Sequence, residues 1–400
     1  MIKLHACLGM AILLAQANSA ADKKFAKPPE QPVNTRIEGH IFIPHSVEPT
    51  EQRLSKLSLP EGFKIRPFAK DLGEPRMLAV ADNGDVYVTR RAPNEDVLLL
   101  RDADGDGTVD QQVTATELKQ VHDIAIKEDL VYLVAVNKLY EGEIQEDGTF
   151  GELSVVLSDL PDGGQHPNRT IKFGPDDYLY LTVGSTCNAC DETNDENATI
   201  LKVDLEAKSR EIFASGLRNT IGFDWHPETG NLYGVDHGID WLGDDDQLEE
   251  LNLIEDGAKY GWPYVFGKSE HNPADEPPAG TSRKQWAKES HEPVLLHEAH
   301  AAPMDLHFYT GDAFPEDYRN DAFVAFHGSW NRSEPSGYNL ARVVFEDDQP
   351  LRFETFVGDF LEDGGKAQFG RPCGLAQTPT GDLLLSDDKH GVIYIISYEG

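Results

Sequence analysis

The sequence predicts an all-β protein, and within that class a six-bladed β-propeller. From Pro60 onward an apolar strand, a turn containing Gly or Asp, and a second strand recur six times. The second strands contain Tyr87, Tyr132, Tyr180, Tyr233, Val324 and Leu384, so successive units lie 45, 48, 53, 91 and 60 residues apart. Repeats of ~40 to 50 residues with several short strands are typical of propeller blades. The alternative is a β-sandwich with appendages, which would not repeat the same strand-turn-strand unit six times. No long helical periodicity favours a helical fold instead.

Each predicted pair joins two short apolar runs that favour extended backbone. In chain order the pairs are 76–80 with 85–88, 124–126 with 131–133, 171–173 with 178–180, 221–223 with 231–233, 306–308 with 322–324, and 374–376 with 382–384. We expect the propeller domain to span residues 52–400. Between the fourth and fifth units lies a polar stretch at about residues 266–290, rich in Pro, Glu and Lys. This stretch predicts a surface excursion or lid inserted between those units.

The amino terminus predicts an exported protein. Residues 1–21 combine a short basic start, an apolar run and small residues at a cleavage site, as a signal peptide does. Residues 22–51 are rich in Pro, Lys and polar residues with little periodicity, so we expect an extended arm. No later stretch reaches the ~18 apolar residues that a membrane-spanning helix needs. We therefore expect a periplasmic or secreted protein without a membrane span.

The chain is strongly acidic, with a formal net charge of −35. Nucleic acids and anionic membrane surfaces attract clustered Lys and Arg, so this charge opposes binding to either of them. The acidic residues are scattered rather than gathered in one block, which is typical of a well-solvated surface.

His166 is the first candidate for catalysis. It stands in the Gly-rich segment 163–170, which leads directly into the third strand pair. A histidine with its ordinary pKa near ~6.5 can take up a proton at neutral pH, which suits a general base. A single loop histidine is more often an ordinary hydrogen-bonding residue, so its role depends on its neighbours.

Three arginines stand beside predicted strands of this acidic chain. Arg218 precedes the first strand of the fourth unit, Arg332 follows the second strand of the fifth, and Arg371 precedes the first strand of the sixth. Such loops converge on the axis of a propeller, so we expect these side chains to share a funnel with His166. A guanidinium binds carboxylates through paired hydrogen bonds. Together the arginines predict a buried anionic ligand.

Two segments predict calcium, which takes several oxygen ligands in flexible geometry. The first combines the turn at Gly238 and Ile239 with Glu249, Glu250 and the segment that contains Tyr260. Carbonyl ligands leave no mark in a sequence, so only the side chains of this site can be named from it.

The second segment is the run 102–110, which resembles the first part of an EF-hand loop. Its alternating carboxylates are Asp102, Asp104, Asp106 and Asp110. The twelfth position is Val113 rather than Glu, and no helices flank the run. A structural Ca²⁺ and an acidic turn that binds no metal both remain open.

Cys187 and Cys190 form a CxxC motif after the third strand pair. Residue 191 is Asp, which excludes c-type haem attachment, and no second CxxC completes a zinc site. In an exported protein we expect a local disulfide, with Cys373 left free. The alternative is a redox-active cysteine pair that shuttles electrons.

Several of these motifs together resemble the glucose/sorbosone dehydrogenase family. The matching motifs are Gln165-His166-Pro167-Asn168-Arg169-Thr170, Gly216-Leu217-Arg218-Asn219, Tyr260-Gly261-Trp262-Pro263, His327-Gly328-Ser329-Trp330-Asn331-Arg332 and Gly370-Arg371-Pro372. The family consists of soluble, six-bladed propeller enzymes that oxidise sugars with pyrroloquinoline quinone (PQQ). The resemblance covers about residues 52–398, and its motifs are specific in combination.

The resemblance implies roles for the candidate residues. His166 matches the catalytic base, Arg218 and Asn219 match a cofactor-contacting pair, and Arg371 matches an arginine that binds the quinone carboxylates. Arg332 lies near the family's basic residue in the fifth blade. The remaining implied residues are Gly238 and Ile239, whose backbone oxygens would hold a cofactor-side Ca²⁺, and His122, His300 and Trp330, which would line the cofactor funnel. A structural role for His122 and His300 is equally open.

Two departures from the family's pattern bear on which sugar is oxidised more than on which cofactor is bound. Glucose-oxidising members carry Gln after Arg-Asn-Pro, where this chain has Thr220 and Ile221, and a further glutamine is replaced around Ser185 and Thr186.

The leading hypothesis is a PQQ- and Ca²⁺-dependent dehydrogenase that oxidises an aldose, a sorbosone-like compound or another carbohydrate. His166 would take the hydroxyl proton while hydride passes to the quinone, and an external cytochrome or quinone would accept the electrons. Two alternatives stay open: a Ca²⁺-dependent lactonase-type propeller hydrolase, and a non-catalytic propeller that binds carbohydrate or protein. The three arginines favour the dehydrogenase.

Overall fold

The computed structural model describes residues 37–91, 93–273 and 275–400. Across these residues nearly all regular structure is β, with strands β1 to β29 and short helices at Glu51–Leu54 (α2), Arg283–Glu289 (α3) and Glu316–Tyr318 (η1). The predicted all-β class is confirmed. The predicted signal peptide, residues 1–21, and the start of the predicted arm lie outside the described residues. None of the described helices is long and apolar enough to cross a bilayer.

Six four-stranded antiparallel sheets account for most of the described chain. The first sheet contains β3 (Pro75–Val80), β4 (Val86–Arg90), β5 (Asp96–Arg101) and β6 (Gln111–Glu117), and the second contains β7 (Val121–Lys127), β8 (Leu130–Ala135), β9 (Lys138–Glu143) and β10 (Ser154–Leu157). The third contains β11 (Ile171–Phe173), β12 (Leu179–Val183), β13 (Thr199–Asp204) and β14 (Ser209–Ser215), and the fourth contains β15 (Thr220–Trp225), β16 (Leu232–Asp236), β17 (Glu249–Ile254) and β20 (Leu295–His297). The fifth contains β21 (Pro303–Phe308), β22 (Ala322–Phe326), β23 (Asn339–Glu346) and β24 (Gln349–Val357), and the sixth contains β2 (Phe63–Ala69), β27 (Pro372–Gln377), β28 (Leu383–Asp387) and β29 (Val392–Tyr398).

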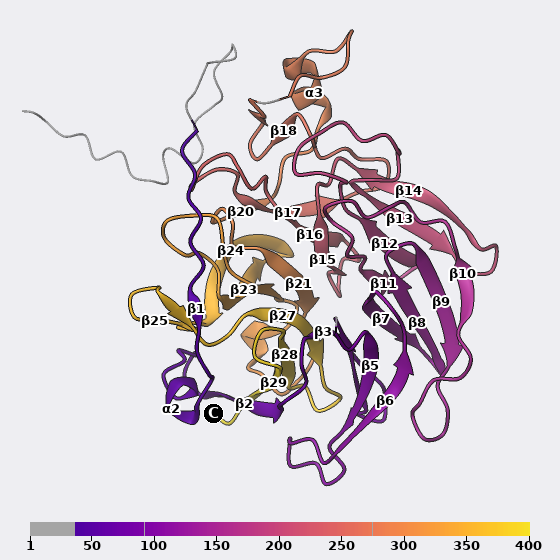
Figure 1. Ribbon diagram of the computed structural model, residues 1–400, viewed down its shortest axis with the longest axis vertical. Coiled ribbons are helices and arrows are strands. Elements are labelled where there is room, and N and C mark those ends of the chain that lie inside the picture. The colour runs from indigo at the N-terminus through magenta and orange to yellow at the C-terminus, as the bar shows by residue number, and fades with distance from the viewer. Residues whose placement is uncertain (1–36, 92, 274) are drawn as a thin grey trace, which may run out of the picture.

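The six strand pairs predicted from the repeat overlap the first two strands of each of the first five sheets and strands β27 and β28 of the sixth, and each pair is antiparallel. The sheets follow one another around a common centre, and the colour in Figure 1 passes round the molecule from purple through pink and orange to yellow. Inner strands of neighbouring sheets contact one another: β3 with β7, β7 with β11, β12 with β15, β15 with β21, and β21 with β27. Strand β27 then contacts β3, so the sixth sheet meets the first.

The sixth sheet joins the two ends of the described chain. Strand β2, near the amino terminus, pairs antiparallel with β29, the last strand, and the sheet order is β2-β29-β28-β27. Pro67 lies in β2, where the missing N–H is tolerated because β2 is an outermost strand. The repeat had indicated only β27 and β28 of this sheet, because β2 lies far from them in the sequence.

The polar insertion lies at a different place from the one predicted. It falls inside the fourth sheet, between its third strand β17 and its fourth strand β20, rather than between the fourth and fifth sheets. It contains the hairpin β18 (Val265–Phe266) and β19 (Glu270–His271) followed by α3. The repeat missed this arrangement because the short strand β20 carries no recognisable pattern of its own.

The described part of the predicted arm is extended, as expected, and runs along the outside of the molecule (Figure 1). Strand β1 (His45–Ser46) pairs in parallel with β26 (Ala367–Gln368), whose other neighbour is β25 (Leu361–Glu362). Closer to the amino terminus, the Phe42 N–H donates to the Trp330 carbonyl at 3.1 Å. The arm therefore reaches the loop that carries the fifth-sheet arginine.

Three aspartates on inner strands fasten neighbouring sheets together. Oδ2 of Asp123 accepts the Ile171 N–H at 2.8 Å, Oδ2 of Asp224 accepts the Phe308 N–H at 3.0 Å, and Oδ2 of Asp305 accepts the Leu375 N–H at 2.8 Å. In each case Oδ1 accepts the N–H of the next residue in its own strand. These carboxylates therefore link the second sheet to the third, the fourth to the fifth, and the fifth to the sixth.

Apolar side chains fill the spaces between adjacent sheets. Between the sixth and first sheets, Leu78, Val88 and Leu98 pack with Leu384 and Ile393, and all five are buried. Burial of one such side chain contributes about 1.5 to 3 kcal/mol. The loops at the ends of the strands are thereby carried on a rigid support.

Candidate active site

The predicted site residues lie on loops at the same ends of their strands. His166 precedes β11, Arg218 and Asn219 precede β15, Arg371 precedes β27, and Arg332 follows β22. The first strands of the sheets contact one another around the ring, so the loops that enter them gather near its centre.

Gly164 places His166. Gly164 adopts φ +51°, and a Cβ there would collide with the backbone of Thr186. The Gln165 N–H donates to the Thr186 carbonyl at 2.8 Å, which fixes the loop against the segment after β12. The Gly-rich sequence is therefore needed for this close approach, because a side chain at Gly164 would be strained and would lack space.

The protonation of the His166 ring follows from its partner Ser185. His166 Nδ1 lies 2.8 Å from the Ser185 carbonyl oxygen and 2.8 Å from its Oγ. A carbonyl oxygen can only accept, so Nδ1 carries the proton in that contact and Nε2 is the nitrogen able to take one up. Burial, together with the positive charge of Arg218, lowers the pKa of His166 to about 3. The ring is thus neutral and able to act as a base at ordinary pH.

Asn219 lies beside His166, with Gly184 between them. A Cβ on Gly184 would lie 2.6 Å from Asn219 Oδ1 and 2.7 Å from His166 Cβ. The backbone N–H of Asn219 donates to Oδ1 of buried Asp236 at 2.8 Å, which holds the start of β15. Loops from the third and fourth sheets therefore meet at this glycine.

Arg218 is buried and held by the small loop between the two cysteines. Its Nε donates to the Asn188 carbonyl at 2.9 Å and its Nη2 donates to Asn188 Oδ1 at 2.6 Å. Cys187 and Cys190 form a disulfide, and Cys373 is a buried free thiol, so both predictions for the described cysteines are confirmed. The disulfide closes the loop whose middle orients the arginine.

The other two arginines also face backbone carbonyls. Arg371 donates from Nε to the His327 carbonyl at 3.1 Å and from Nη2 to the Gly328 carbonyl at 2.7 Å. Arg332 donates from Nη1 to the Ala299 carbonyl and from Nη2 to Asp245 Oδ1, both at 3.3 Å, and its buried Nε has no hydrogen-bond partner among the described residues. Both guanidinium groups therefore retain hydrogen-bonding capacity for a ligand.

Trp330, the candidate next to Arg332 in the sequence, packs edge-on against Trp241, with ring centroids 5.4 Å apart. Trp241 is 48% exposed, so the pair lies at the surface of the loop face. This position suits contact with an incoming ligand more than burial of a bound cofactor.

His122 and His300 use both ring nitrogens within the protein. His122 Nδ1 lies 2.8 Å from the Arg169 carbonyl, and its Nε2 lies 3.3 Å from Nη2 of Arg76. His300 Nε2 lies 2.8 Å from the Gly243 carbonyl, and Asn331 Nδ2 lies 3.0 Å from its Nδ1. These contacts favour the structural role left open for both histidines over direct contact with a cofactor.

The turn at Gly238 and Ile239 is held from within by acidic and amide side chains. The Gly238 N–H donates to Glu249 Oε2 at 2.9 Å, and the Ile239 N–H donates to Gln247 Oε1 at 3.0 Å. Oε1 of Glu249 accepts the Ala302 N–H at 2.9 Å. Glu249 therefore holds the backbone of two sheets, and the turn can offer its carbonyl oxygens to a cation.

Glu250 and Tyr260 border a small buried space of about 10 Å³. Glu250 accepts the Gly267 N–H at 2.6 Å, while the Tyr260 hydroxyl donates to the Leu253 carbonyl at 2.6 Å. Burial raises the pKa of Glu250 to about 7, that of Glu249 to about 8 and that of Asp236 to about 6. Such an excess of buried acids is chemically suited to a divalent cation.

The acidic run 102–110 forms a separate, partly exposed turn between β5 and β6. Asp102, Asp104 and Asp106 each place a carboxylate oxygen within 4.8 Å of the others. Asp102 accepts the N–H groups of Gly105, Asp106 and Gly107, and Asp110 accepts that of Ala103. The turn is therefore organised by its own hydrogen bonds, and its metal remains a prediction.

Five polar residues of the loop face were not assigned from the sequence: Arg76, Ser185, His237, His327 and Asp388. His237, His327 and Asp388 each directly follow the second strand of the fourth, fifth and sixth sheets. A polar residue at this equivalent position in three repeats was the available signal. Arg76 could have been noticed as a lone cation within an apolar strand.

A ring of four-stranded antiparallel sheets defines a β-propeller, and the candidate histidines and arginines gather at one of its loop faces. The chain belongs to the TrAA12-like family, whose model matches residues 57–399. An uncharacterized protein of Borreliella burgdorferi is 30% identical over 384 residues, which cover 90% of this chain and 96% of that protein. The PQQ-dependent pyranose dehydrogenase of Coprinopsis cinerea is 23% identical over 424 residues, which cover 89% of this chain and 56% of that enzyme.

Solved structures show the same fold. A Trichoderma reesei member of carbohydrate-active enzyme family AA12 superposes with a TM-score of 0.75 at 19% identity, covering 92% of this chain and 100% of that one. The PQQ domain of the Coprinopsis cinerea pyranose dehydrogenase, in its holo form, superposes with a TM-score of 0.74 at 19% identity, covering 89% of this chain and 100% of that one. The resemblance to soluble PQQ-dependent sugar dehydrogenases, noted from the motifs, is confirmed.

Proposed function

We propose that this protein is a PQQ-dependent dehydrogenase that oxidises a sugar or related carbohydrate in the periplasm or outside the cell. Relatives from Coprinopsis cinerea and Hypocrea jecorina are PQQ-dependent sugar dehydrogenases. One observation in this chain carries the proposal: His166, neutral and free to accept a proton at Nε2, lies next to Asn219 and under the influence of Arg218. Each of the six sheets is then one blade of a six-bladed propeller.

The loop face offers the donors that a small polyanion such as PQQ requires. The buried Nε of Arg332 lacks a partner among the described residues, and Arg371 directs only Nε and Nη2 to backbone carbonyls. Arg218, Arg332 and Arg371 would neutralise the ligand's carboxylates, and Asn219 would add an amide contact. When bound, PQQ supplies the acceptor for a hydride from the sugar.

His166 would take the proton of the substrate hydroxyl at Nε2. Its Nδ1 keeps its proton and donates it in a hydrogen bond to the Ser185 carbonyl, which keeps the ring in one tautomer and one orientation. Burial and Arg218 keep the ring neutral before the reaction. A base positioned in this way contributes about 10²- to 10⁴-fold to the rate.

Calcium would be held by the carbonyl oxygens of the turn at Gly238 and Ile239, close to the ligand. Glu249 and Gln247 fix this turn through its N–H groups, so the carbonyls are positioned before a cation arrives. A second cation would lie by Glu250 and the backbone of Tyr260, where buried acids need compensation. The turn with Asp102, Asp104, Asp106 and Asp110 is a third, independent candidate for Ca²⁺.

The test is reconstitution of the purified apoprotein with PQQ and Ca²⁺, followed by dye reduction on a panel of aldoses and sorbosone-like compounds. The dye stands in for the external cytochrome or quinone that we expect as the electron acceptor. We expect reduction only when both PQQ and Ca²⁺ are present. No reduction with any sugar would reject the dehydrogenase, and lactone hydrolysis with Ca²⁺ alone would support the hydrolase instead.

A further inference from the structure

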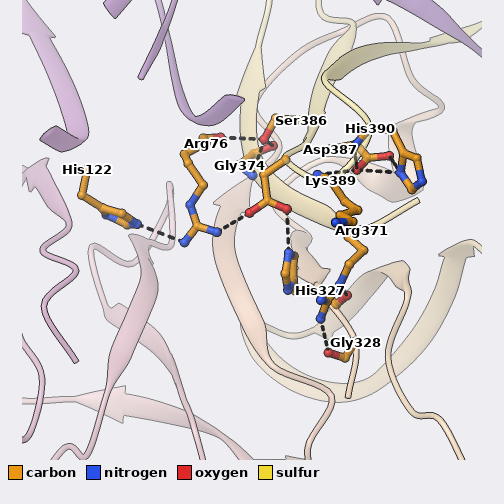
Figure 2. A network of polar contacts seen from close by, with 11 residues as sticks. Arg76, His122, His327, Gly328, Arg371, Gly374, Ser386, Asp387, Lys389 and His390 are labelled. Carbon is orange, nitrogen blue, oxygen red and sulfur yellow. Dashed lines mark hydrogen bonds and ion pairs between the residues drawn. The ribbon is translucent and has the colours of Figure 1, made fainter. Parts of the chain in front are cut away.

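A buried polar network crosses the loop face from the second sheet to the fifth (Figure 2). Asp388 lies at its centre and accepts from Arg76 Nη1 at 2.5 Å through one oxygen, while His327 Nε2 lies 2.7 Å from the other. The side chain of Arg76 is 3% exposed and that of Asp388 is 10% exposed. Burying an ion pair costs free energy that the pairing often does not recover. Stability alone therefore does not explain why this charged network is buried.

The pairing with Asp388 decides which nitrogen of His327 is free. A carboxylate can only accept, so Nε2 of His327 carries the proton in that contact, and Nδ1 is left as a proton acceptor. His327 directly follows β22, and its carbonyl accepts from Arg371, one of the proposed ligand-binding arginines. Figure 2 shows the Arg371 and His327 side chains next to each other. His327 therefore belongs to the same loop face as the proposed site.

Arg76 is held in place at both ends. Nη2 lies 3.3 Å from His122 Nε2, and His122 Nδ1 lies 2.8 Å from the Arg169 carbonyl, so the His122 ring accepts from Arg76. At the backbone end, Ser386 Oγ donates to the Arg76 carbonyl at 2.6 Å. Arg76 is thus held beside Asp388 by His122 at its guanidinium and by Ser386 at its backbone.

The charges around His327 come from several elements. Arg371 and Arg76 oppose protonation of His327, Asp388 favours it, and His237 interacts electrostatically with both His327 and His166. Burial is the largest cause that lowers the pKa of His327. Asp388 is therefore the one group in this set whose charge stabilises an imidazolium at residue 327.

The overall reaction releases two protons, one in each of two stages. Converting an alcohol carbon to a carbonyl releases two electrons and two protons, counting the hydride as one proton and two electrons. His166 can take the hydroxyl proton, and the electrons leave to an external one-electron acceptor. The second proton must leave the site when the electrons do, and His166 belongs to the first of these two stages.

We propose that Nδ1 of His327 accepts this second proton during electron transfer to the external acceptor, and that Asp388, held by Arg76, is the positioning residue that makes this possible. The inference rests on the proposed dehydrogenase function. In its first stage the C–H and O–H bonds of the sugar break, the hydride would pass to the quinone, and His166 gains the hydroxyl proton, which it then releases to solvent. In its second stage the two electrons leave one at a time to two molecules of the one-electron acceptor, and His327 gains the proton that came with the hydride, which it then passes to solvent.

The test separates the two stages in protein reconstituted with PQQ and Ca²⁺. Stopped-flow mixing with sugar alone measures the first stage, and mixing of the sugar-reduced protein with a one-electron dye measures the second. For Asp388→Asn we expect an unchanged first stage and a second stage slowed about tenfold. His327→Gln should slow the second stage by about 10² or more, as expected for removal of a base. His166→Ala should show the reverse pattern.

Asp387→Asn is the matched control. Asp387 and His390 form a second buried Asp–His pair one residue away, with Oδ2 and Nδ1 2.9 Å apart. This pair contacts none of the network residues Arg76, His122 or His327, so both stages should keep their rates. Equal slowing of both stages in Asp388→Asn, or an unchanged second stage in either network variant, would overturn the proposal.

The protonation state of His327 can also be measured without any turnover. Imidazole ¹⁵N NMR of the apoprotein should show His327 protonated at Nε2, and Asp388→Asn should shift this ring toward a mixture of tautomers. A wild-type His327 protonated at Nδ1 would contradict the proposal even if no sugar is oxidised. Failure of the dehydrogenase function would instead show as the absence of a first stage in the wild-type protein.

Discussion

At the scale of single residues, the chemistry of His166 depends on a partner without charge. Ser185 offers its carbonyl oxygen and its hydroxyl at 2.8 Å, so the ring is oriented but its protonated form gains no counter-charge. His327 has the opposite arrangement, because its partner Asp388 is a carboxylate. The two histidines are therefore suited to accept protons at different stages of the proposed reaction.

Replacing His166 tests the proposed base directly. We expect His166→Ala to lose about 10²- to 10⁴-fold in kcat, because the hydroxyl proton then has no acceptor. The affinity for PQQ, measured by titration of the apoprotein, should change by a few-fold at most. His45→Ala, an exposed histidine in β1, is the control. Near-normal turnover in His166→Ala would remove this residue from the reaction.

The pH profile should reflect the depressed pKa of His166. Because burial and Arg218 lower this pKa to about 3, the neutral ring persists as the pH falls from 8 to 5. We therefore expect kcat/KM for the sugar to show no loss near pH 6.5, the ordinary titration range of histidine. A steep loss of kcat/KM centred near pH 6.5, with no other histidine titrating there by ¹⁵N NMR, would contradict a buried base that stays neutral.

Arg371 tests the anionic character of the ligand. Removing one charged hydrogen-bonding group costs about 1.5 to 3 kcal/mol, so Arg371→Ala should weaken PQQ binding by about 10- to 100-fold. Arg352→Ala, a half-exposed arginine on β24, should leave it unchanged. Unchanged reconstitution of Arg371→Ala at limiting PQQ would place the cofactor elsewhere.

At the scale of elements, short neighbouring loops orient the side chains of the site. The segment 187–190 is closed by a disulfide, and Asn188 within it accepts two hydrogen bonds from Arg218. Asn188 Oδ1 also accepts the Asp240 N–H at 3.0 Å, so this loop joins the third sheet to the turn that carries Gly238 and Ile239. The cysteine pair therefore has a structural role beside the site.

Removing the disulfide should loosen Arg218 without unfolding the protein. We expect the double variant Cys187→Ser and Cys190→Ser to bind PQQ about tenfold more weakly, which corresponds to about 1.4 kcal/mol, the scale of one hydrogen bond to a charged group. Cys373→Ser, which removes a buried thiol in β27, is the comparison for general destabilisation. Wild-type affinity in the double variant would show that the loop holds Arg218 without its covalent closure.

At the scale of the whole molecule, the ring depends on the meeting of its two ends. Strand β2 adds the fourth strand to the sixth sheet, and β27 contacts β3 of the first sheet. Arg76 of the first sheet and Asp388 of the sixth meet across this junction, so opening the ring there would separate members of one network. The linking aspartates Asp123, Asp224 and Asp305 lie between other neighbouring sheets.

A disulfide across this junction should stabilise the fold. Lys64 and Ser397 are paired in register between β2 and β29, at the outer edge of the sixth sheet. Oxidised Lys64→Cys with Ser397→Cys should gain about 2 to 4 kcal/mol of unfolding free energy, because the crosslink closes almost the whole ring in the unfolded chain. The measurement is the urea midpoint, with Ser397→Cys alone as the control. An unchanged midpoint in the crosslinked protein would contradict this expected stabilisation.

Much of the fold was readable because its signals are local. The turn-separated apolar pairs located two strands of every sheet, and the Gly-rich loop before β11 marked His166. The outer strands were harder to locate, because residues such as those of β20 or β2 have no repeat and gain their order only from a neighbour distant in the chain. The insertion was misplaced for the same reason.

The sequence by itself determined the all-β class, the six repeated strand pairs, the disulfide and the arginine and histidine types from which a site could be built. Only the tertiary structure decided which of these groups work together. The contacts that define the site, such as Gly184 between His166 and Asn219, or Asp388 with His327 61 positions away, join different sheets. No local periodicity encodes such contacts, because they arise only when the ring closes and brings equivalent loops to one centre.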